Sequence, residues 1–117
     1  MVVRGIRGAV SIEANTTDAI LSATKELLMR LVEENQVATV DITAVHFSAT
    51  PDLNAAFPAR AARLMGWENV PLFGHLEMDV PGAPARCIRV LMLVNTDLKQ
   101  EQIKHIYLGE TRRLREL

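Results

Sequence analysis

One stretch of this chain, residues 16–34, repeats its core-type residues at the spacing of an α-helix, between runs with the β-branched character of strands. Asn15-Thr16-Thr17-Asp18 supplies a capping side chain and an acid for the helix start, and Asn35 is the expected stop. The repeated positions are Ile20, Thr24, Leu27, Leu28, Leu31 and Val32. The stretch therefore predicts one long helix that ends near Glu34.

The remaining elements predict an α+β fold. Pro58 suits the first turn of a short helix that runs through Met65 and is closed by Gly66, and another short helix is expected over residues 99–105. The expected strands cover residues 2–12, 40–48, 70–78, 86–95 and 106–108. This order predicts a single domain over residues 1–117, with a mixed β-sheet and helices packed on one face. The bare face favours oligomerisation; a sheet that curls over its own loops is the alternative.

Composition limits the binding partners and the cellular compartment that we expect for this chain. A formal net charge of −1 gives no field to hold a polyanion, so nucleic-acid binding is not expected. The lone Cys87 excludes an internal disulfide and suits a reducing compartment. No apolar run approaches roughly 20 residues, and the N-terminus lacks a signal peptide's apolar stretch. We expect no membrane contact and a cytoplasmic location.

Charged residues on otherwise apolar strands are the candidate site. No phosphate loop, dinucleotide fingerprint or metal-ligand spacing is present, so neither a metal nor a cofactor is expected. Arg7, Glu77 and Arg89 each alternate with apolar or small residues, and burying them costs several kcal/mol unless they are paired. Arginine's planar fork also suits carboxylate ligands. The patterns alone leave two readings open, a structural ion pair and a site for a bound anion.

Five segments, in order along the chain, resemble the trimeric chorismate mutases of the Bacillus type. They are Arg4–Ala9 (RGIRGA), Ser48–Ala59 (SATPDLNAAFPA), Glu77–Val80 (EMDV), Cys87–Val90 (CIRV) and Ile103–Leu108 (IKHIYL). The resemblance implies a homotrimer whose sheets form a central pseudo α/β-barrel, with active sites between subunits. It also implies conversion of chorismate to prephenate by a [3,3] Claisen-type rearrangement without a cofactor.

The same resemblance implies roles for individual residues. Arg89 would contact the ether oxygen and a carboxylate, Arg7 and Tyr107 would hold a carboxylate, and Glu77 would accept from the ring hydroxyl. Substrate-binding positions would be Phe57, Arg60, Arg63, Phe73, Gly74 and Leu114. Of these, Phe57 and Arg63 would come from the neighbouring subunit.

The C-terminal tail carries a further expectation. Leu114 would lie in a tail that closes over the site, but the family's tail usually continues beyond Arg115-Glu116-Leu117, so its ordering is left open. The basic residues Arg112, Arg113 and Arg115 are either a solvated terminus or a means of drawing in the dianion. No role is assigned to His75.

Two other functions compete with the mutase. A non-catalytic trimeric protein that binds a small anion would need the arginines but not Glu77, so Glu77 favours the enzyme. A related trimeric hydrolase or deaminase would need a general base and a positioned water, and the sequence gives no clear sign of either.

Overall fold

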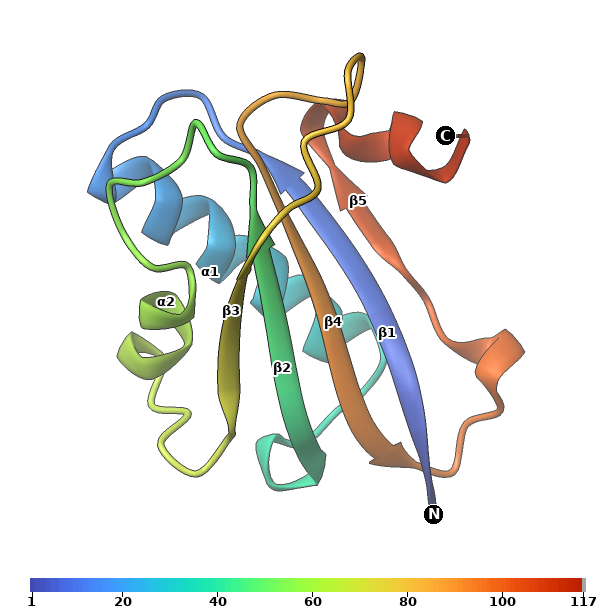
Figure 1. The fold of residues 1–117 in the computed structure, drawn as a ribbon. Coiled ribbons are helices and arrows are strands. Elements are labelled where there is room, and N and C mark those ends of the chain that lie inside the picture. Colours follow the sequence, from blue (N-terminus) through green and yellow to red (C-terminus); the bar gives the residue numbers. More distant parts are fainter. Residues whose placement is uncertain (117) are drawn as a thin grey trace.

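The computed structural model describes residues 1–116 and is built on one five-stranded sheet (Figure 1). Its strands are β1 (Val2–Ser11), β2 (Ile42–Ala49), β3 (Leu72–Leu76), β4 (Cys87–Thr96) and β5 (Ile106–Leu108). They lie in the order β3-β2-β4-β1-β5. The pairs β1–β4 and β2–β4 are antiparallel, whereas β1–β5 and β2–β3 are parallel. The prediction of a mixed sheet in an α+β fold is confirmed.

Helix α1 (Thr17–Glu34) crosses behind the sheet in Figure 1 and supplies most of the core on that face. The hydroxyl of Thr16 caps it by accepting from the backbone N–H of Ala19 at 3.1 Å. Gly8 on β1 lets the helix approach closely, because a Cβ there would lie 3.1 Å from Leu27 and Leu31. The predicted core positions on this helix are buried, except Val32, which is partly buried.

The end of α1 also organises the last third of the chain. The helix stops at Asn35 as predicted, and the buried Asn35 amide donates to the carbonyls of Leu31 and Lys104, each at 2.9 Å. Its oxygen accepts from the backbone N–H of Lys104 at 2.8 Å. The Asn35 side chain thus bonds both backbone groups of Lys104, as a neighbouring strand would, just before β5 begins.

The two faces of the sheet differ in what covers them. Helix α2 (Ala59–Leu64) packs against α1, so both α-helices lie on one face. On β4, Ile88, Val90 and Met92 point into this core, while Arg89 and Leu91 point to the opposite face. Within the described residues, only the end of that opposite face near β1 and β5 is covered, by the 3-10 helix η3 (Gly109–Glu116). The predicted placement of helices on one face therefore applies to α1 and α2 but not to η3.

Several predicted boundaries were wrong. The second strand starts at Ile42 rather than at residue 40, because Thr39–Asp41 forms a 3-10 turn (η1). The third strand, expected over residues 70–78, spans only Leu72–Leu76. The helix expected over residues 99–105 is one 3-10 turn, Gln100–Gln102 (η2), because Asn35 holds the following residues in an extended conformation. Within residues 1–116, none of the helices has both the length and the apolar character needed to cross a membrane.

Candidate active site

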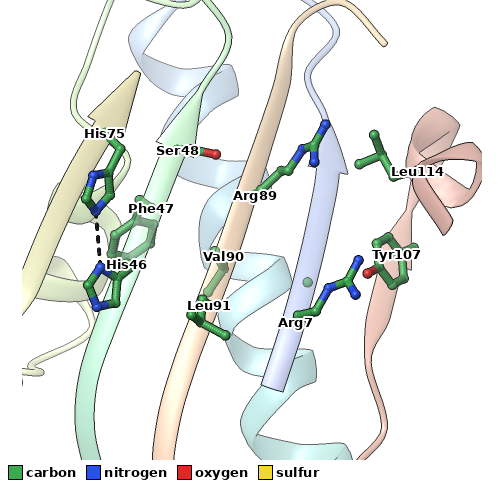
Figure 2. A pocket seen from close by; sticks show the side chains of 11 residues that line it. Arg7, His46, Phe47, Ser48, His75, Arg89, Val90, Leu91, Tyr107 and Leu114 are labelled. Atoms are coloured by element: carbon green, nitrogen blue, oxygen red, sulfur yellow. Dashed lines mark hydrogen bonds between the residues drawn. The ribbon is translucent and has the colours of Figure 1, made fainter. Parts of the chain in front are cut away.

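Arg7 and Arg89 lie on the neighbouring strands β1 and β4 and point to the same face of the sheet. Register places Arg7 opposite Leu91 and Ala9 opposite Arg89, so the two arginines are diagonal neighbours. Figure 2 shows the Arg89 side chain extending over β1 toward Leu114 and the Arg7 side chain extending from β1 toward Tyr107. They line a cavity of about 330 Å³ together with those two residues. Two guanidinium groups thus converge on one open pocket.

Glu77 follows β3 directly and forms an ion pair with Arg89. Its Oε1 lies 3.1 Å from Nε of Arg89 and accepts from the hydroxyl of Ser48 at 2.7 Å, while Oε2 accepts from the backbone N–H of Met78 at 2.9 Å. The Glu77 side chain is 15% exposed and that of Arg89 is 39% exposed. Among the described residues the buried Nε–H of Arg89 has no aligned hydrogen-bond partner, so the contact with Glu77 is a charge contact. Either open reading, structural pair or ligand site, can include this pair.

Arg7 is held at both its side chain and its backbone by the segment that contains β5. Its guanidinium carbon lies 5.9 Å from the centre of the Tyr107 ring, within reach of a cation–π contact. Its backbone N–H donates to Nδ1 of His105 at 2.9 Å. Tyr107 itself pairs with Ala9 in the parallel ladder between β1 and β5. The position of Arg7 therefore depends on residues 105–107.

The C-terminal helix η3 packs beside the cavity. Leu114 is buried against Ala9, Cys87 and Tyr107. The buried Thr111 hydroxyl donates to the carbonyl of Leu108 at 2.7 Å. The turn into η3 requires Gly109, which has a φ of 66° and where a Cβ would overlap the Ser11 side chain. These contacts give η3 a defined position next to Arg89.

The basic residues of the tail do not all behave as a solvated terminus. The guanidinium of Arg113 donates to the carbonyl of Gly82 at 3.1 Å, which links η3 to the loop before β4. Arg112 is exposed. The side chain of Arg115 lies outside the part of the chain that the structure describes.

The remaining predicted residues lie elsewhere on the chain. Arg60, Arg63, Phe57 and Gly74 line a second cavity of about 750 Å³, between α2 and β3. Phe57 is 78% exposed, and the chain does not bring this group to Arg7 or Arg89. Phe73 lies on the open face of the sheet against a pair of histidines. Within one chain the predicted site is therefore in two parts.

Four side chains around these groups were not predicted from patterns. His46 and His75 face each other on β2 and β3, with Nδ1 and Nε2 3.1 Å apart. Ser48 fixes the Glu77 carboxylate, and only the pairing of β2 with β3 brings them together. His105 stands within the quoted IKHIYL segment, but its bond to Arg7 depends on the path of the chain before β5.

Side-chain hydrogen bonds of Asp52 and Thr50 fix the loop that leads to Phe57. The carboxylate of Asp52 accepts from the Thr50 hydroxyl and from the backbone N–H of Arg86. The Thr50 bond is the main cause of a lowered pKa at Asp52, and the Arg86 contacts add to it. Thr50 in turn accepts from the N–H of Cys87, whose thiol pKa is raised by burial to about 11. Cys87 is thus a neutral packing residue beneath Arg89.

Comparisons with known proteins agree on one kind of protein. Residues 3–116 match the family model described as chorismate mutase type I. The chain is 50% identical to chorismate mutase AroH of Bacillus subtilis (strain 168) over 109 residues, which are 92% of this chain and 86% of that protein. It is 49% identical to chorismate mutase AroH of Thermus thermophilus over 114 residues, which are 97% of this chain and 93% of that protein. A solved chorismate mutase from Clostridium thermocellum superposes with a TM-score of 0.91 at 46% identity, covering 92% of this chain and 96% of that one.

Proposed function

This chain belongs to the type I chorismate mutase family, and from that premise we propose that its reaction takes place in the cavity lined by Arg7 and Arg89. The enzyme is an isomerase that converts chorismate to prephenate by a [3,3] Claisen-type rearrangement. The comparisons give no support to the non-catalytic anion-binding trimer. The observation that carries the proposal is the convergence of two arginines beside a fixed carboxylate.

The chemistry needs binding and charge rather than a reactive group. Chorismate carries two carboxylates and must be held in a compact shape before its bonds exchange, and guanidinium forks can hold that shape. In the transition state, negative charge develops on the ether oxygen and positive charge on the ring. A site with opposite charges already in place stabilises both without reorganising.

The proposed catalytic roles follow the charges. Arg89 contacts the ether oxygen and one carboxylate, and Glu77 accepts from the ring hydroxyl and faces the positive ring. Arg7 and Tyr107 hold a carboxylate. The contact of Arg89 with Glu77 through Nε, on the inner edge of the guanidinium, supports this division, because the terminal nitrogens extend toward the cavity (Figure 2). Leu114, next to Tyr107, would exclude water.

The second half of the site is proposed to come from a neighbouring copy in a homotrimer. Phe57 and Arg63 of that copy would reach the Arg89 cavity of this chain, with Arg60, Phe73 and Gly74 beside them. Exposed apolar side chains on and after β3 support an interface there: Phe73, Leu76, Met78 and Val80. The proposal includes a central pseudo α/β-barrel made of the bare sheet faces, one domain over residues 1–117, and a cytoplasmic location.

Purified protein tests the reaction directly. Loss of chorismate absorbance, followed by conversion of the product to phenylpyruvate in acid, should occur far above the spontaneous rate. A protein that leaves chorismate at the background rate would contradict the proposal.

Mixed trimers test the shared site. Arg63→Ala and Arg89→Ala proteins should each be nearly inactive, and refolding them together should restore about a quarter of the wild-type specific activity. This follows because some interfaces then carry both intact arginines. Each variant refolded alone is the control. Absence of recovery, or sedimentation as a monomer, would contradict an active site between subunits.

A further inference from the structure

Side chains, rather than a strand, cover much of the outer edge of β1. The strand β5 pairs only with residues 8–10 of β1, so the backbone groups before Gly8 need other partners. The amide of Gln100 supplies them at Gly5, with Nε2 donating to the Gly5 carbonyl at 2.8 Å and Oε1 accepting from its N–H at 3.2 Å. Arg4 adds a bond from Nε to the carbonyl of Leu98 at 3.0 Å.

His105 performs the same task at Arg7, directly beside the site. Alternate residues of a strand present their amides to the same edge, so Arg7 follows Gly5 along this edge. Nδ1 of His105 accepts from the Arg7 N–H at 2.9 Å. A neutral imidazole can accept at Nδ1 only when its proton is on Nε2, so this bond selects one tautomer. The bond fixes the backbone from which the Arg7 guanidinium reaches the cavity.

We infer that His105 is a positioning residue, which sets the affinity for chorismate by fixing the backbone of Arg7. This inference rests on the proposed role of Arg7 as a carboxylate ligand. Two residues later, Tyr107 faces the Arg7 guanidinium at 5.9 Å, so one short segment fixes both ends of the arginine. A displacement of about 1 Å at a substrate-holding group is enough to change kinetics severalfold to a hundredfold.

The expected signature is a change in KM. Arg7 is proposed to bind a carboxylate in both the ground state and the transition state, so its displacement weakens both equally. The KM of His105→Ala for chorismate should rise roughly tenfold, while kcat changes less than about threefold. A purely structural role would instead lower the folded fraction, and with it the apparent kcat, at an unchanged KM.

Matched variants separate the bond from bulk and edge stability. His105→Asn places an oxygen at the δ position of the lost Nδ1 and should restore KM to within about twofold of wild type. His105→Gln carries its amide one bond further out and should behave like the alanine variant. Gln100→Ala removes two bonds from the same edge without touching Arg7, so its KM should stay near the wild-type value.

The outcomes distinguish this inference from the function it rests on. If His105→Ala folds and keeps a normal KM, or if Asn and Gln behave alike, the positioning role is wrong. The Asn and Gln comparison decides the question even if the alanine variant does not fold. Arg7→Ala tests the underlying proposal, because a normal KM there would remove Arg7 from the site altogether. A raised KM in Arg7→Ala with a normal KM in His105→Ala would refute only the positioning role.

Discussion

Replacing Arg89 by alanine is the most direct test of charge stabilisation in this enzyme. The change removes a half-buried cation from β4 and leaves Glu77 with its two hydrogen bonds, from Ser48 and Met78. Because that carboxylate stays satisfied and the pair is partly exposed, the free energy of unfolding should fall by only about 1–2 kcal/mol. Most of the protein should therefore remain folded.

The loss of transition-state stabilisation should be larger. Removing one neutral oxyanion donor costs about 3–4 kcal/mol, and Arg89 is a charged donor proposed to meet both the ether oxygen and a carboxylate. We expect kcat/KM to fall by at least about 4 kcal/mol, or roughly a thousandfold. A loss of transition-state stabilisation of about 4 kcal/mol, against a loss of unfolding free energy of about 1–2 kcal/mol, would distinguish a catalytic role of Arg89 from a structural one.

The measurement combines steady-state rates of chorismate loss with urea denaturation of the same preparation. Arg4→Ala is the matched control, since it removes a guanidinium from β1 whose Nε bonds Leu98, away from the cavity. The control should keep kcat/KM within about threefold of the wild-type value. A folded Arg89→Ala protein with near-normal turnover would refute the catalytic role and leave the structural ion pair as the explanation.

Three further perturbations test the surroundings of the site. The Thr50 hydroxyl lowers the pKa of Asp52 below its ordinary 3.8; because this carboxylate is exposed and solvent screens it, Asp52→Asn should cost no more than about 1 kcal/mol of unfolding free energy at neutral pH. The pKa of Asp52 is lower in the folded state than in the unfolded state. Urea titrations should therefore find the full difference in unfolding free energy between wild type and variant above pH 3.8, and should find it lost as the pH falls through the folded-state pKa. Burial raises the pKa of Cys87 to about 11, so roughly one thiol in a thousand is ionised at pH 8 and iodoacetamide should label only unfolded protein; rapid labelling of native protein would overturn this. Gly109→Ala should lower Tm more than Gly66→Ala, which shares the positive φ but has open space, and equal losses would refute the steric argument.

Sequence periodicity predicted the elements that are held by their own apolar pattern. The spacing of residues 20–32 defined α1, and alternation located the strands that pair in the middle of the sheet. It failed over residues 99–105, where the buried Asn35 side chain binds Lys104 and overrides the local helical preference. Helix η3 was not predicted, because its sequence is mostly charged and the residues against which Leu114 packs, Ala9 and Cys87, are distant in the sequence.

Sequence patterns predicted only part of the candidate active site. Charge on apolar strands singled out Arg7, Arg89 and Glu77, and the structure brings Arg89 and Glu77 into contact. Tyr107 came from family resemblance alone, because a tyrosine on a three-residue strand has no distinctive pattern. Phe57 lies in a separate cavity of the same chain, and no periodicity could predict that separation.

The pairing of β1 with β4 has a consequence for how the enzyme is made. Val2 lies opposite Thr96 and Ser11 opposite Cys87, so β1 leaves the ribosome long before the strand with which it pairs has been made. Such distant pairing is slow, and the early strand has time to meet other nascent chains. The pairing of these two strands also sets Arg7 diagonal to Arg89, so the proposed site forms together with the centre of the sheet.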